Sequence, residues 1–146
     1  MHTYWDTYFN NIINWENEYN IIHKFNDNRV KQFKLKLIHK IIPSKEVRFT
    51  WKIASDQLCN TCQVKENYKH LFIDCKEITI FWQKINEMFT HCGISNNMNT
   101  LKHIVIGYKI NSPEYFVINE ILAIIGFSIY KTYFISESRL KKVDIF

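Results

Sequence analysis

Apolar side chains recur at helical spacing along the first third of the chain. In the first 25 residues they follow one another at steps of three and four, which predicts one or two amphipathic helices. After a turn and cap cluster at Asn26–Asn28, a second apolar face predicts a helix that Pro43 ends. The expected core residues are Trp5, Tyr8, Phe9, Ile12, Ile13, Trp15, Tyr19 and Ile22 in the first segment and Val30, Phe33, Leu37 and Ile41 in the second.

Two further helices are predicted on either side of a cysteine-containing segment. Ser44 is suited to cap a short helix in which Val47 and Trp51 face inward. A longer helix is expected over residues 77–92, with Gly93 as its C-terminal cap. Its apolar residues are Ile80, Phe81, Trp82, Ile85, Met88 and Phe89.

The C-terminal part of the chain predicts one long helix. Ser112–Glu114 combines a cap, a proline at the first helical position and an acid in the first turn, so a helix is expected over about 112–136. The segment 101–110 fits either a strand or a short helix, and 138–146 resembles a fraying basic tail. Because no repeat or linker divides the chain, we expect one mainly α-helical domain over residues 1–146.

The composition is typical of a packed, helix-rich globule. Apolar residues make up 47% and aromatic residues 16% of the 146 positions, with only three Gly and two Pro. The N-terminus has no basic region followed by an apolar run, so the four cysteines favour an intracellular, reducing compartment. The most apolar stretch, Ile121–Tyr130, is about half as long as a membrane span. We interpret it as a buried helix and expect no membrane partner.

The formal net charge of +5 is concentrated in one segment. Residues 24–52 carry nine Lys or Arg against two acidic residues, a local charge of +7. Helical spacing places these cations in stripes before and after Pro43, which suits the phosphate backbone of RNA or DNA. The stripes are equally compatible with ordinary solvated helix faces. The candidate nucleic-acid-binding residues are Arg29, Lys36, Lys40, Lys45, Arg48 and Lys52.

Three of the four cysteines belong to a metal-binding pattern. Two residues separate Cys59 from Cys62, seven more precede His70, and four more precede Cys75. Thiolate and imidazole are preferred ligands of tetrahedral Zn²⁺, and a Cys pair at this spacing can fill two corners from one turn. The main alternative is a disulfide, which leaves the remaining two groups without an explanation. We therefore expect one structural zinc ion bound by these four side chains.

The second ligand pair is expected at the end of a short helix. We predict this helix over about 67–74, with His70 near its middle. Five residues on a regular helix turn through about 140°, too far for both ligands to meet one ion, so Cys75 should lie just past the helix end. Cys92 is a possible rival ligand, but its place on an apolar helix face predicts a buried thiol.

Further features accompany the cysteine motif. A basic helix ends in Ile42–Pro43, Leu58 precedes the first Cys, His70–Phe72 precedes the last Cys, and Phe81–Trp82 follows six residues after it. Taken together, these motifs resemble the zinc-binding domain of reverse transcriptases encoded by LINE-type non-LTR retrotransposons. The resemblance covers about residues 30–90.

The resemblance implies a zinc-binding accessory domain near the C-terminus of a larger polyprotein. It implies zinc ligation by the four residues above and a packing role for Phe81–Trp82, and the helix over 112–136 is similar to the family's usual continuation. Asn60 and Lys76 stand where many relatives have proline, which are minor departures. The larger departure is in residues 1–58, where we expect no polymerase or endonuclease portion.

No catalytic motif accompanies the zinc motif. No two acidic residues are adjacent, although a two-metal polymerase site typically contains such a pair, and three scattered glycines form no phosphate loop. Four Cys and His ligands would close the zinc shell, so we expect no hydrolysis there. We predict a non-catalytic module that contacts the backbone of RNA or DNA beside a reverse transcriptase portion, compatible with a nuclear role. The alternatives are a zinc-stabilised structural or protein-interaction module and a truncated element copy without its own activity.

Overall fold

Helices dominate the computed structural model, which describes residues 3–94, 100–107 and 115–143. In chain order they are α1 (Thr3–Tyr8), α2 (Trp15–His23), α3 (Asn28–Ile38), α4 (Lys45–Thr50), the π-helical turn η1 (His70–Asp74), α5 (Lys76–His91), α6 (Leu101–Ile106) and α7 (Tyr115–Val143). The described part contains no strand, only one isolated antiparallel β-bridge between Leu58 and Lys65. The prediction of a mainly α-helical fold is confirmed.

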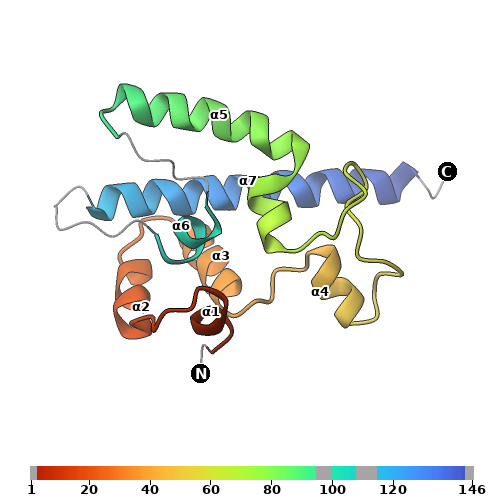
Figure 1. The fold of residues 1–146 in the computed structure, drawn as a ribbon, viewed down its shortest axis with the longest axis horizontal. Coiled ribbons are helices and arrows are strands. Elements are labelled where there is room, and N and C mark those ends of the chain that lie inside the picture. The colour runs from red at the N-terminus through yellow and green to blue at the C-terminus, as the bar shows by residue number, and fades with distance from the viewer. Residues whose placement is uncertain (1–2, 95–99, 108–114, 144–146) are drawn as a thin grey trace.

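The long helix α7 runs along the length of the molecule, with α5 on one side and α1, α2 and α4 on the other (Figure 1). The core forms where α7 packs on α3, α6 and η1. Phe33 of α3 lies within it, and its ring contacts those of Phe72, Phe127 and Tyr130. A Cβ at Gly126 of α7 would lie 3.0 Å from the Phe33 ring, so the glycine permits the close approach of these helices.

Two buried indoles connect neighbouring elements. The Nε1–H of Trp5 donates to the carbonyl of Ile38 at 2.8 Å and thereby fixes α1 on the end of α3. The Nε1–H of Trp82 donates to the carbonyl of Phe72 at 2.7 Å and fixes α5 on η1. Both indoles are only 1% exposed, so the expected packing role of Trp82 is confirmed.

Helix α3 ends before the predicted stop at Pro43, and the early end changes which residue is buried. Lys40 has a positive φ of 54°, and the N–H of Ile41 donates to the carbonyl of Lys36 at 3.0 Å, the pattern of a Schellman motif. This reversal leaves Ile41 50% exposed, whereas Ile42 is fully buried. The prediction that Ile41 belongs to the core is therefore wrong.

Helix α4 ends in the same way. Lys52 has a positive φ of 61°, and the N–H of Ile53 donates to the carbonyl of Arg48 at 2.8 Å. Val47 is buried as expected. Trp51, which was expected to face inward, is 48% exposed because it is the last residue before the reversal.

Helix α5 matches its predicted bounds to within one residue, and Gly93 follows it with a positive φ of 81°. The buried face of this helix is narrower than predicted. Trp82 and Phe89 face the core, which leaves Ile80 and Met88 on the other side with 59% and 44% of their surface exposed. The N-terminal segment shows the same narrowing, because a turn separates α1 from α2 and leaves two of its expected core residues, Tyr8 and Ile12, 46% and 94% exposed.

The C-terminal part differs from its prediction in extent. The ambiguous segment 101–110 contains helix α6, and the predicted cap at Ser112–Glu114 lies outside the described residues. Helix α7 continues to Val143, past the expected end near residue 136. The extension includes Glu, Arg, Leu and Lys, which are good helix formers.

Part of α7 is apolar on nearly all sides. The stretch Phe116–Ile135 has a mean hydropathy of 1.3, with 39% of its most apolar part buried, and by length and composition it would suffice to cross a membrane. Core helices of soluble proteins pass the same test, so this is weak evidence for a membrane span. Within the predicted buried helix, Leu122, Ile125 and Ile129 are buried and Ile124 is 45% exposed.

Candidate metal centre

A tight hairpin over residues 57–66 presents the first two predicted ligands. The N–H of Cys59 donates to the carbonyl of Val64 at 2.8 Å beside the β-bridge. Gln63 has a positive φ of 57°, which lets the chain reverse directly after Cys62. The two cysteines therefore project from one turn, as their spacing predicted.

The π-helical turn η1 presents the second pair. The N–H of Cys75 donates to the carbonyl of His70 at 2.9 Å, a bond between residues five apart that makes the turn wider than an α-helix. Cys75 itself has φ −59° and ψ 137° and is the N-cap of α5, so its predicted place just past the helix end is confirmed. The regular helix expected around His70 is replaced by the π-turn, which begins at that residue.

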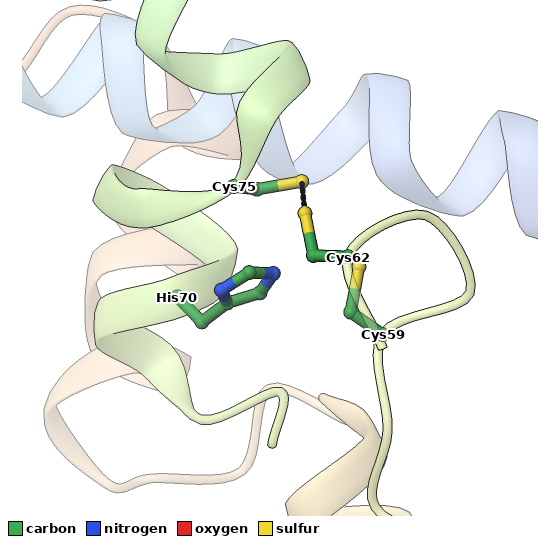
Figure 2. A group of neighbouring side chains, drawn as sticks. All are labelled: Cys59, Cys62, His70 and Cys75. Carbon is green, nitrogen blue, oxygen red and sulfur yellow. Dashed lines mark hydrogen bonds between the residues drawn. The ribbon is translucent and has the colours of Figure 1, made fainter. Parts of the chain in front are cut away.

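The four predicted ligands converge on one point. The ligand atoms of Cys59, Cys62, His70 and Cys75 all lie within 4.8 Å of one another, and Figure 2 shows the sulfurs and the imidazole gathered between the hairpin and η1. The sulfurs of Cys62 and Cys75 are 3.9 Å apart. Two thiolates on a tetrahedral zinc ion lie about 3.8 Å apart, whereas a disulfide requires about 2.0 Å. The structure therefore contains no disulfide here, and all four cysteines are free.

The imidazole of His70 contributes a buried nitrogen to the cluster. The residue is 6% exposed, and its Nε2 has no hydrogen-bond partner among the described atoms. Leaving a buried polar nitrogen unsatisfied costs about 1–3 kcal/mol, which coordination of a metal ion would offset. The backbone N–H of His70 is held separately, by the side-chain oxygen of Asn67 at 2.8 Å.

The beginning of α5 influences the two sulfurs that lie nearest to it. Burial raises the pKa of the Cys75 thiol to about 12, and the backbone N–H of Glu77 partly opposes that rise. The backbone N–H of Lys76 lowers the pKa of the Cys62 thiol. Since metal binding needs thiolates, the site would release protons on binding and hold its ion more weakly at low pH.

A buried carboxylate connects the hairpin to α4 and α7. Glu66 is 3% exposed, and its Oε1 accepts the backbone N–H of Lys45 at 2.9 Å and the hydroxyl of Tyr133 at 2.6 Å. The Tyr133 oxygen also accepts a hydrogen bond from Nη2 of Arg48 at 2.6 Å. Sequence reasoning missed Glu66 and Tyr133, because 67 residues separate them and no local pattern marks either one.

Two of the six candidate nucleic-acid-binding cations take part in the contacts that hold the hairpin against α4 and α7. Lys45 donates from Nζ to the side-chain oxygen of Asn60 at 2.7 Å and lies 3.6 Å from Asp56, with only 15% of its side chain exposed. Arg48 is held by Tyr133. Both side chains are thus directed toward the hairpin and α7, so the six candidates do not form a single free stripe.

The other four candidates lie nearer to the surface. Arg29 is 70% exposed in its side chain but pairs with Asp27 at 2.9 Å. Lys40 places its Nζ 3.7 Å from the centroid of the Tyr4 ring. Lys36 and Lys52 are exposed. Contact of these residues with phosphates stays a prediction.

A cavity of about 190 Å³ borders the ligand cluster. Its walls include Cys59, His70 and Cys75 on one side and Thr132 and Tyr133 of α7 on the other. Cys92, the possible rival ligand, is exposed at the end of α5, so the prediction that it is a buried thiol is wrong. The apolar face of α5 has ended at this point, because the Schellman turn that follows the helix begins here.

The cluster has the donor set and the spacing of a four-ligand site. Comparisons of the chain with protein-family models, with curated proteins and with solved structures find no match. Function therefore has to be inferred from the residues of the chain and their geometry.

Proposed function

We propose that this chain is a zinc-stabilised module in which Cys59, Cys62, His70 and Cys75 bind one structural Zn²⁺. The observation that carries the proposal is the convergence of four ligand atoms within 4.8 Å of one another. Three thiolates and an imidazole are donors that favour Zn²⁺ over hard cations such as Mg²⁺ or Ca²⁺. Four protein ligands leave no open position, which is typical of a structural site.

The metal ion would stabilise the hairpin. Leu58 and Val64, its apolar side chains, are 41% and 49% exposed, whereas Cys59 and Glu66 are buried. The hairpin therefore has almost no apolar core of its own. In zinc-dependent modules the metal contributes on the order of 10 kcal/mol to folding, enough to replace that missing core.

Metal content tests the zinc site directly. We expect one equivalent of zinc in the purified protein and none in Cys62→Ala or Cys75→Ala. Both variants should also melt more than about 10 °C lower, since several kcal/mol are lost. Cys92→Ala is the matched control, because this exposed cysteine lies outside the cluster, and it should keep both the zinc and the melting temperature. A full equivalent of zinc in Cys75→Ala would refute the site.

We further propose that the module binds the phosphate backbone of RNA or DNA, as an accessory domain of a LINE-type reverse transcriptase. The support is the motif resemblance together with the local charge of +7 over residues 24–52. Lys36 and Lys52 are the best-placed contacts because both are exposed. Lys45 and Arg48 are assigned to supporting the hairpin instead, because their side chains already bind Asn60 and Tyr133.

A charge-reversal comparison tests the nucleic-acid proposal. Affinity for a labelled 20-nucleotide strand should fall between about 50 and about 200 mM salt, because phosphate contacts release counterions. Lys36→Glu with Lys52→Glu should weaken binding by on the order of tenfold. Lys84→Glu with Lys131→Glu changes the net charge equally at exposed positions of α5 and α7, and should have a much smaller effect. Equal losses in the two double variants would mean that only the total charge matters.

One observation favours a second candidate, a protein-interaction module. Val117, Ile124 and Ile135 are 55%, 45% and 43% exposed and share one face of α7 at helical spacing. Trp5 is buried and Phe127 is partly buried, so neither supplies such a surface. Self-association that Ile124→Glu abolishes would support this candidate, and a monomer at all concentrations would count against self-association.

A further inference from the structure

A second cavity, of about 150 Å³, lies between α1 and the residues that immediately precede His70. Its walls include Tyr4 and Tyr8 on one side and Asn67 and Lys69 on the other. We infer that this cavity is the site for an unpaired nucleobase of a bound nucleic-acid strand. The inference rests on the proposed nucleic-acid function and specifies which part of the strand the protein binds.

The aromatic wall is exposed yet firmly supported. Tyr4 and Tyr8 are 42% and 46% exposed, and their rings stack with centroids 5.9 Å apart and an interplanar angle of 28°. Behind them, Trp5 contacts the rings of Phe9 and Tyr68 at 5.4 and 6.0 Å. Exposed rings on a rigid backing are stacking surfaces for bases, worth about 1–3 kcal/mol per base.

One cation lies in the cavity wall and another beside the Tyr4 ring. The Nζ of Lys40 lies 3.7 Å from the Tyr4 ring centroid. Lys69 is 57% exposed in its side chain and pairs with Asp74 at 3.6 Å. An exposed pair of this kind contributes little, so Lys69 can exchange it for a phosphate. Glu46 also lines the cavity and offers an acceptor to the amino group of a base.

The zinc site and this cavity share one segment of backbone. Asn67 and Lys69 line the cavity, and the Asn67 side chain accepts the N–H of His70. An interaction that immobilises His70 therefore also immobilises this wall of the cavity. The flat rings and the neighbouring Lys69 and Lys40 favour a nucleobase with its phosphate over an acidic peptide, which would leave the stacking surfaces unused.

Fluorescence anisotropy with a 12-nucleotide single strand, and with the same strand annealed to its complement, tests the inference. Tyr8→Leu should weaken single-strand binding by about tenfold and leave duplex binding unchanged, because a duplex presents no free base face. Tyr8→Phe keeps the ring and should bind like the wild type. Trp51→Leu is the matched control, an aromatic side chain of 48% exposure directly after α4, and should change neither affinity.

The outcomes separate this inference from the proposed function. Wild-type binding with no loss in Tyr8→Leu would overturn the nucleobase site and leave backbone binding intact, whereas no binding to either nucleic acid would overturn both. If Tyr8→Leu fails to fold, Lys69→Gln takes its place, because the residue is exposed and is not a metal ligand. It should lower single-strand affinity by about threefold through loss of one phosphate contact, and unchanged affinity would overturn the site. Competition by an acidic peptide at similar affinity would assign the cavity to a protein partner and also overturn it.

Discussion

Lys34 of α3 shows how one buried charge can make stability depend on pH. The residue is 5% exposed, and its Nζ donates to the carbonyls of Ile104 and Val105 at 2.7 and 2.6 Å. These carbonyls belong to the last turn of α6, where intrahelical donors run out, so Lys34 acts as their cap. Burial lowers the pKa of Lys34 to about 8, and the charge of Glu18 partly opposes that shift.

The lowered pKa sets the sign of a pH effect. Between pH 8 and about 10.5 the unfolded chain holds a proton on this lysine that the folded protein lacks, so the free energy of unfolding should rise with pH. The group contributes a rise of about 3 kcal/mol across this window. Urea unfolding at several pH values should show this rise in the wild type and in Lys36→Met, an exposed control on the same helix. It should be absent in Lys34→Met, and parallel pH profiles for Lys34→Met and the wild type would contradict the assignment.

Backbone conformation at single residues also explains where sequence patterns fail. Asn and Gly are recognisable helix terminators, and Asn10 and Gly93 do follow α1 and α5 with positive φ. Lys40 and Lys52 take the same left-handed conformation after α3 and α4, although nothing in a lysine signals it. The ends of those two helices, and the exposure of Ile41 beside one of them, were therefore beyond prediction.

At the scale of elements, local spacing predicted which four side chains lie together, but not the contacts that hold them in place. Cys59 and Cys62 lie on one turn, so their proximity follows from sequence alone. The approach of His70 to Cys75 depends on a π-turn, which no residue pattern specifies. The contact between Glu66 and α7 spans 67 residues and follows only from the packing of the whole chain.

That contact should couple the last helix to the metal site. Tyr133→Phe removes the hydroxyl that donates to Glu66 and accepts from Arg48, so a buried carboxylate loses a partner. We expect a loss of about 1–3 kcal/mol in the free energy of unfolding and faster zinc transfer to a chelator. Tyr130→Phe is the control, a partly buried ring on the same helix that packs on Phe33, and it should change both quantities little. Equal behaviour of the two variants would show that Glu66 does not communicate with α7 through Tyr133.

Across the whole molecule, two parts of the fold depend on different forces. One buried cluster gathers side chains from α1, α3, α4, η1, α5, α6 and α7, and a smaller one joins Ile22, Phe25, Val30, Ile38 and Ala123. No residue of 48–67 contributes a buried side chain to either cluster. The hairpin therefore has only its few hydrogen bonds and the proposed metal ion to stabilise it, whereas the helices around α7 have their own core.

Removing the metal should accordingly open one region before the rest. After zinc is withdrawn with a chelator, we expect faster amide hydrogen exchange over residues 57–66, including the N–H of Cys59 that binds Val64. The amides of α3 should stay protected, because Phe33 and Leu37 are buried in the main cluster independently of the hairpin. Exchange measured by mass spectrometry on holo and metal-free protein, with Cys92→Ala as the matched control, resolves the two regions. Uniform loss of protection would mean that the ion supports the whole fold, and unchanged protection over 57–66 would mean that the hairpin does not need it.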